Sequence, residues 1–301
     1  MKKWLTILTL LTWTSSVLAD LPEIKLTPEW KDKITQKAPS KPTVQPQKEQ
    51  TVLLFSLMTG YQHWVTPHTS AVVKILGDKT SAYNVIESND INMFSKDNLK
   101  KFDAVILNNT CSISPQRNMF LDVLGKEKEQ QAKQLEQNLI NFVADGNGLV
   151  AIHGAIVFIN SSEAFCDVLG GAFDFHPDQQ EVIATPCDPN HPLTKAFKDK
   201  PLIHVDEPYL FNGAYTKKNF HPLMVMDTDK LDSGERTKEV QADVRYIAWI
   251  KKHEKGRVFY CSPSHNAQSF EDPRLLQFVL DGIQYALGDL KCDDSPLKPK
   301  Q

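Results

Sequence analysis

The chain of 301 residues lacks an excess of positive charge. Its 34 lysine and arginine residues are outnumbered by 37 acidic residues, and its formal net charge is −3. Nucleic-acid-binding domains usually carry a basic stripe, so we expect no nucleic-acid partner. After the N-terminal segment the chain also lacks any run of 18 apolar residues. This absence predicts a mature protein without stable membrane insertion.

Cysteine is scarce and irregularly spaced. The five cysteines form no Cys-x-x-Cys pair and no zinc-finger pattern, which argues against a structural zinc site of that kind. Their number is odd. One disulfide is an alternative for this chain, but its two cysteines cannot be deduced from the spacing. We interpret Cys166 and Cys261 as small buried apolar side chains.

The N-terminus has the three parts of a secretory signal peptide. Lys2 and Lys3 precede an apolar run over residues 4–13, and Val17-Leu18-Ala19 offers a cleavage site before Asp20. We predict that residues 1–19 are a signal peptide and that the protein is exported, either to the periplasm or as a secreted protein. The alternative is a membrane anchor, for which the apolar run is short.

Composition divides the rest of the chain into three parts. Residues 20–50 are rich in proline, lysine and glutamine, and five prolines from Pro22 to Pro46 are expected to interrupt any helix. We interpret this segment as a flexible linker or a strap on the surface. Residues 51–290 are expected to form one domain, and the acidic, proline-containing residues 291–301 a frayed tail.

Strand and helix patterns alternate through the first half of the domain. Strands are predicted over 51–57, 83–88, 103–109 and 148–154, and helices over 67–79, after Ser95, over about 127–144 and over 163–169. This order predicts an α/β fold with a mainly parallel sheet and helices on both faces. The second half is less regular. It offers strands near 180–187, 201–205, 222–227, 244–251 and 257–262, and a closing helix over about 272–287.

Polar side chains gather after the predicted strands, where sheets of this class bind ligands. The candidates are His63, Asn108, His153, His176, His204, Asp206, Glu207 and His265. His153 is the most informative, because it ends a buried strand at a tight turn, as the side chain of a nucleophile elbow does. An imidazole there suits a general acid, a general base or a metal ligand. The alternative is a buried histidine that is hydrogen-bonded to the backbone.

Seven segments carry a resemblance to a known family. They are GYQH (60–63), DAVILNN (103–109), NFVADGNGLVAIHGA (141–155), LGGAFDFHP (169–177), HPLTKAF (191–197), DEPYLF (206–211) and GRVFYCSPSHN (256–266). Through their order and spacing the chain resembles the ThuA-like, or trehalose-utilisation, family over residues 51–289. The resemblance implies the class I glutamine amidotransferase-like superfamily, a flavodoxin-like three-layer sandwich and a link to carbohydrate metabolism.

The family's motif residues can be placed on this chain one by one. Its histidines match His63, His153, His176 and His265, and its Asp-Glu-x-Tyr motif matches Asp206, Glu207 and Tyr209. The chain departs from the family at Gln62, where arginine is common, and at Ser264, where glycine is usual. Amidotransferases of the superfamily need a cysteine at the elbow. Because His153 stands there and Cys166 lies in the next helix, we expect no glutaminase activity.

These residues lead to three predicted sets. We predict catalytic roles for His153, Glu207 and His176, and substrate contacts for Tyr61, Asn108, Asp206 and Tyr209. A divalent metal such as zinc would be held by His63, His153, His176 and His265, since zinc accepts imidazole together with carboxylate. Without metal, His153 and Glu207 could share acid–base chemistry. The alternative for each residue is a hydrogen-bonded loop residue or a surface residue.

Two functional hypotheses follow, with a small carbohydrate as the ligand of both. The first is an exported enzyme that acts on a carbohydrate or a keto-sugar derivative by hydrolysis, elimination or isomerisation. The second is a non-catalytic carbohydrate-binding protein that uses the same cleft. A structural interaction module is a third hypothesis, in which substitution of His153 or His176 would not change the function.

Overall fold

The computed structural model describes residues 21–297 of the chain. The predicted signal peptide, residues 1–19, lies outside this range. Within the range, no helix is both long enough and apolar enough to cross a membrane. All five cysteines fall inside it, and each is a free thiol.

Five parallel strands form one half of a nine-stranded sheet. Their order is β2 (Asn84–Ser88), β1 (Thr51–Phe55), β3 (Ala104–Asn108), β4 (Gly148–Ile152) and β11 (Gly256–Cys261). Strands β3 and β4 are buried along their whole length. That burial explains why these segments are nearly continuous apolar runs, because helices cover both faces of the sheet.

Four antiparallel strands extend the sheet beyond β11. They are β10 (Arg245–His253), β9 (His221–Met226), β6 (Gln180–Pro186) and β7 (Leu202–Asp206), in this order. A separate two-stranded sheet pairs β5 (Ala172–Phe175) with β8 (Leu210–Asn212). The predicted α/β fold is thus confirmed, and the parallel part is its core. The less regular second half of the sequence supplies the antiparallel extension.

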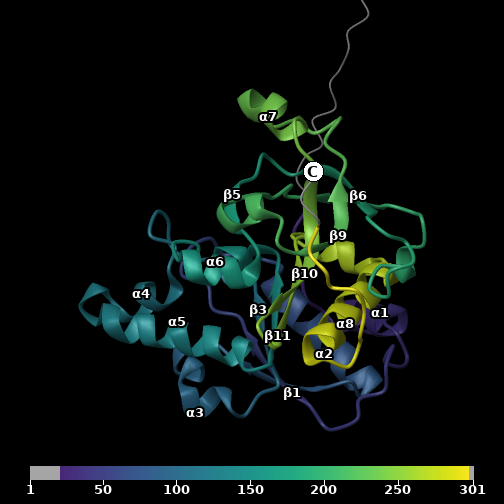
Figure 1. The fold of residues 1–301 in the computed structure, drawn as a ribbon. Coiled ribbons are helices and arrows are strands. Elements are labelled where there is room, and N and C mark those ends of the chain that lie inside the picture. The colour runs from purple at the N-terminus through teal and green to yellow at the C-terminus, as the bar shows by residue number, and fades with distance from the viewer. Residues whose placement is uncertain (1–20, 298–301) are drawn as a thin grey trace, which may run out of the picture.

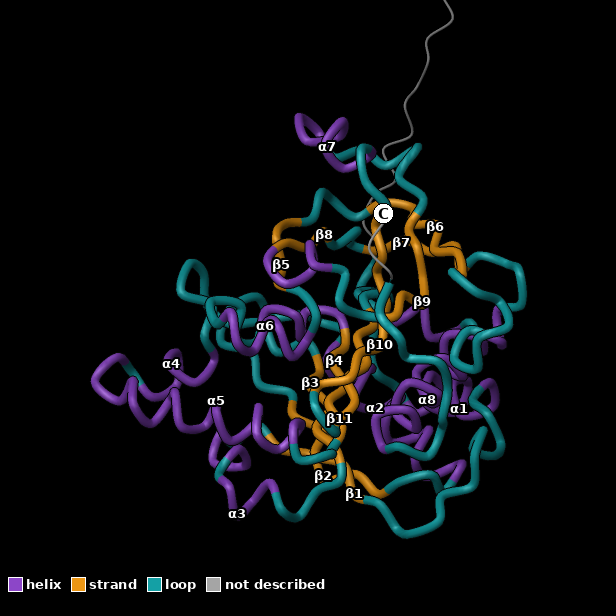
Figure 2. The backbone as a smooth tube through the Cα atoms, viewed as in Figure 1, coloured by secondary structure: helices purple, strands orange, loops and turns teal. Residues whose placement is uncertain are grey.

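Helices pack on both sides of the sheet (Figure 1). On one side lie α3 (Lys96–Leu99), α4 (Met119–Leu124), α5 (Glu129–Ala144) and α6 (Glu163–Leu169). On the other side lie α1 (Pro28–Lys37), α2 (Thr66–Thr80) and α8 (Pro273–Leu287). The short helix α7 (Thr237–Gln241) stands apart, above the antiparallel strands. In Figure 2 the strands of the nine-stranded sheet lie between these two sets of helices.

The helix ends follow the capping residues of the sequence. Ser95 and Ser162 accept hydrogen bonds from the first turns of α3 and α6, as N-cap residues do. Gly288 ends α8 in the left-handed conformation that favours glycine. Helix α1 corrects the expectation that prolines exclude helix from residues 20–50. Pro28 occupies its first turn, where no amide hydrogen is needed, and Thr27 caps it.

The segment after α1 is fastened to α8 by polar contacts. The Thr43 amide donates to Gln284 Oε1 at 2.8 Å, and the Gln284 side chain donates back to the Val44 carbonyl. The Thr43 hydroxyl donates to Asp281, which also accepts from Gln277. Asp281 is 2% exposed, and this burial raises its pKa to about 7.

We predict that Asp281→Asn stabilises the protein above pH 7. The folded state binds the Asp281 proton more tightly than the unfolded chain, so raising the pH from about 4 to 7 lowers the free energy of unfolding. The raised pKa corresponds to a loss on the order of 4 kcal/mol. Asparagine keeps the acceptor oxygen without titrating. Urea unfolding at pH 5 and pH 8 measures the effect, and an equal fall in stability for wild type and variant would contradict it.

Candidate functional site

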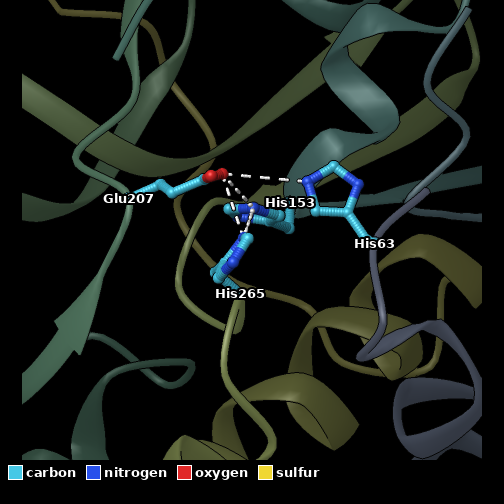
Figure 3. Close-up of side chains that lie close together, drawn as sticks. All are labelled: His63, His153, Glu207 and His265. Atoms are coloured by element: carbon cyan, nitrogen blue, oxygen red, sulfur yellow. Dashed lines mark hydrogen bonds and ion pairs between the residues drawn. The ribbon is translucent and has the colours of Figure 1, made fainter. Parts of the chain in front are cut away.

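Four buried side chains converge beside the carboxyl ends of the parallel strands (Figure 3). They are His63 from the loop after β1, His153 directly after β4, His265 after β11, and Glu207 directly after β7. One ligand atom from each lies within 4.8 Å of the others. We call these four residues the His/Glu cluster. Of the five residues with predicted catalytic or metal-binding roles, four are therefore in this cluster, and His176 lies outside it.

His153 occupies the tight turn that the sequence predicts. Its φ is 49°, in the left-handed region that residues other than glycine rarely adopt. The turn opens a short 3₁₀ helix, His153–Val157. The ring is held by its Nδ1, which lies 2.8 Å from the Ser262 carbonyl and donates to it. In the neutral imidazole this leaves Nε2 with its lone pair facing the cluster.

The lone pair of His153 Nε2 faces a carboxylate oxygen and a second imidazole nitrogen. Its Nε2 lies 3.2 Å from Glu207 Oε2 and 3.2 Å from His265 Nδ1. A carboxylate oxygen and an imidazole lone pair repel each other at this distance. A proton or a cation between the two atoms converts the repulsion into attraction. The geometry of the cluster therefore suits a bound positive charge.

Glu207 is the only carboxylate of the His/Glu cluster. Its Oε2 lies 3.0 Å from His265 Nδ1 and 3.8 Å from His63 Nε2. Burial by itself would raise the pKa of Glu207. A proton held between Glu207 and His153, together with hydrogen bonds from His265 and His63, outweighs burial and holds the pKa below its ordinary value. The side chain is thus an ionised acceptor inside the protein.

His63 completes the cluster from the opposite side. Burial is the main cause that lowers its pKa to about 4, so its imidazole is neutral near pH 7. Its Nδ1 lies 3.6 Å from Cys111 Sγ, and the Tyr209 hydroxyl lies 3.4 Å from its Nε2. A neutral imidazole has the protonation state that metal binding requires.

Asp206 positions His265 from the protein interior. Its carboxylate accepts from the Ser264 amide at 2.8 Å and from the His265 amide at 3.2 Å. It also pairs with His204 Nδ1 at 3.1 Å. Burial opposes ionisation of Asp206, but His204 and the cluster histidines hold its pKa below the ordinary value. The carboxylate of Asp206 is 2% exposed and holds the loop of His265, while its predicted contact with substrate stays a prediction.

The side chain of Asn108 faces helix α2. Its side-chain amide donates to Ser56, to the Thr66 carbonyl and to Ser70, with donor–acceptor distances between 3.0 and 3.1 Å. These contacts tie β3 to α2, and Asn108 is fully buried. The structure thus places Asn108 outside the His/Glu cluster, and its contact with substrate stays a prediction.

A cavity of about 220 Å³ opens beside the cluster. His63 and Glu207 line it, together with Tyr61, Arg117, Phe173, His176 and Tyr209. The predicted ligand His176 lies outside the four-residue group. Its Nε2 is 3.7 Å from Glu207 Oε1, and its side chain is 34% exposed. It stacks on Tyr209 with ring centroids 5.3 Å apart.

Three residues beside the His/Glu cluster cannot be predicted as site residues from the sequence. Cys111 packs against His63, Arg117 lines the cavity, and the Gln179 side-chain amide lies 3.1 Å from His265 Nε2. Each acts through a contact with a residue far along the chain, and none lies in a recognisable motif. No local pattern could have identified them.

The donor set of the cluster matches a zinc-type ion. Three imidazoles and one carboxylate are ligands that zinc and similar divalent ions accept. The hydrogen bond from His153 Nδ1 to Ser262 fixes the ring orientation, as outer contacts of metal ligands do. His63, His153, Glu207 and His265 are therefore the residues that could hold such an ion.

Comparison with known proteins shows the family of the chain. The family model described as "Trehalose utilisation" (ThuA) matches residues 51–286. The chain belongs to the ThuA family. The fold of this ThuA-family protein is similar to that of a ThuA-like protein from Bacteroides uniformis. The TM-score is 0.60 at 16% identity, over 81% of this chain and 94% of the other.

A second ThuA-like structure, from Parabacteroides merdae, gives a TM-score of 0.55 at 16% identity. That alignment covers 83% of this ThuA-family chain and 98% of the other. At these identities the structural likeness shows the fold alone. A search of curated protein sequences found no significant match. The family resemblance carried by the seven sequence segments is thus confirmed.

Gly154 makes room for the ring of His63, which leads to a prediction. A Cβ atom at residue 154 would lie 2.6 Å from His63 Cε1 and 2.7 Å from Cys111 Sγ. We predict that Gly154→Ala displaces His63 and weakens zinc binding about 10–100-fold, as the loss of an outer contact does.

Calorimetric titration with zinc measures this change. Gly171→Ala is the matched control, because its added methyl group would meet Trp249 at 3.3 Å and not the cluster. Unchanged zinc affinity in Gly154→Ala, with a folded protein, would show that the position of His63 does not matter for the metal.

Proposed function

We propose that this ThuA-family protein is an enzyme that acts on a carbohydrate or a keto-sugar derivative through a divalent metal at the His/Glu cluster. The observation that carries the proposal is the convergence of four buried ligand-type side chains beside one cavity. The substrate class rests on the family description, "Trehalose utilisation". We also propose, from the N-terminal pattern of residues 1–19, that the chain is exported.

The protein's own residues divide the work. His63, His153, His265 and Glu207 would hold the ion, which when bound would polarise a carbonyl group or lower the pKa of a water molecule. His176 faces Glu207 from the cavity side and is half-exposed, so it can exchange protons with a ligand. It therefore is the candidate general acid or base.

Aromatic side chains give the cavity walls that suit a sugar. Tyr61 is 60% exposed at the mouth, and Phe173 and Tyr209 lie deeper with ring centroids 4.9 Å apart. Sugar rings have an apolar face that packs on such walls and hydroxyl edges that need polar partners. This wall also favours the second candidate function, a non-catalytic carbohydrate-binding protein.

The metal half of the proposal predicts one zinc ion per chain. His153→Ala removes a ligand whose ring is fixed by Ser262, and we expect it to weaken zinc binding at least about 100-fold. Titration of the metal-free full chain measures it. His191→Ala is the control, since His191 is also buried but bonds to the Asp293 carbonyl, away from the cluster. Equal zinc affinity of His153→Ala and wild type would contradict the metal site.

The catalytic half predicts that His176→Ala lowers turnover about 10²–10⁴-fold, the range typical of a lost general acid or base. The assay uses neutral disaccharides and their keto derivatives, with products detected by NMR. Sugar binding should persist in the variant, because the aromatic wall remains. Bound sugar without product in the zinc-loaded wild type, weakened by Tyr61→Ala, would favour the binding protein over the enzyme.

A further inference from the structure

Arg117 adds a fixed positive group to the cavity wall. It lies in the loop between β3 and α4 and lines the same cavity as Glu207 and Tyr209. Glu207 is the only acidic residue among those that line this cavity, and three histidines already surround it. The charge of Arg117 therefore lacks a free counter-charge in the cavity.

Other arginines of the chain show the difference. Arg236 lies 3.8 Å from the centre of the Phe175 ring and pairs with Asp174 and Glu239. Arg274 lies 5.4 Å from the Phe197 ring and pairs with Asp272. In both, aromatic stacking accompanies a salt bridge inside the protein.

The guanidinium of Arg117 is stacked but not paired. Its Cζ lies 4.7 Å from the centre of the Phe173 ring. Within residues 21–297 it forms no salt bridge and no side-chain hydrogen bond. A guanidinium carries five N–H donors in a rigid fork that matches a carboxylate or a phosphate. The N–H donors of Arg117 can therefore bind a ligand in the cavity.

The backbone holds Arg117 in a rarely populated conformation. Its φ is 44°, in the left-handed region. Its amide donates to the Ile113 carbonyl at 2.6 Å, and its own carbonyl accepts from the Ser161 amide at 3.3 Å. Such a conformation costs free energy and often marks a functional position. The restraint also places the guanidinium before a ligand arrives.

We infer that Arg117 binds an anionic group of the substrate, so that the cavity takes a single sugar ring that carries a carboxylate or a phosphate. The inference rests on the proposed carbohydrate function and names the class of sugar. The cavity of about 220 Å³ is smaller than the roughly 300–1,000 Å³ of pockets for drug-sized ligands, which suits one ring. A neutral sugar would leave the stacked guanidinium without a charge partner, which disfavours it.

The test compares three probes that differ in charge: D-glucose, D-glucuronate and D-glucose 6-phosphate. Each is titrated into the metal-free full chain, so that an anion cannot bind to an ion at the cluster. We expect at least one anionic sugar to bind about 10–100-fold more tightly than glucose, as charge-assisted hydrogen bonds provide. Tighter binding of glucuronate would identify a carboxylate as the anionic group of the substrate, and tighter binding of glucose 6-phosphate would identify a phosphate.

Two variants connect the preference to Arg117. Arg117→Met keeps an apolar stem over Phe173 and should abolish the preference, while its affinity for glucose stays within about threefold of wild type. Arg236→Met, at a stacked arginine that does not line the cavity, should keep the preference. Urea unfolding of both variants verifies that they fold.

Three results would overturn the inference. If glucose binds as tightly as both anionic sugars, or if Arg117→Met keeps the preference for them, Arg117 does not bind an anionic group of the substrate. The proposed carbohydrate function is unaffected by either result. If no probe binds the folded wild type, either metal-free or loaded with zinc, the carbohydrate function fails, and this inference fails with it.

Discussion

The opposed lone pairs of His153 Nε2 and Glu207 Oε2 are the constraint on which the site depends. They lie 3.2 Å apart in a buried volume, with His265 Nδ1 at a similar distance from each. Burying an ionised carboxylate is unfavourable unless it is paired. The fold tolerates the group because three imidazoles surround it, and a positive charge at their centre completes the pairing.

The sheet topology brings these groups together from both of its halves. The parallel strands β1, β4 and β11 lead to His63, His153 and His265, since their carboxyl ends meet at one edge. Glu207 comes from β7, at the far end of the antiparallel extension. The extension thus adds the carboxylate to a site that the parallel strands begin.

The parallel strands and the position of His153 could be predicted from the sequence. Buried strands are apolar runs, and the turn at His153 follows such a run. Helix α1 cannot be predicted from proline content, because proline breaks helix interiors but is favourable in a first turn, where Pro28 lies. The end of a strand predicts a ligand contact for Asn108, and the structure shows its side chain against α2. Whether such a residue faces a ligand or a helix depends on the side of the sheet to which it points. Arg117 depends on a ring 56 positions away, Phe173, which no local pattern encodes.

The central claim is that the His/Glu cluster binds a divalent ion. Crystals of the full chain soaked in zinc, measured at the zinc absorption edge, test it most directly. The account predicts one anomalous peak bonded to nitrogen atoms of His63, His153 and His265 at about 2.0–2.1 Å and to Glu207 at about 2.0–2.2 Å. Zinc bound elsewhere on the protein, with no peak among these four side chains, would contradict it.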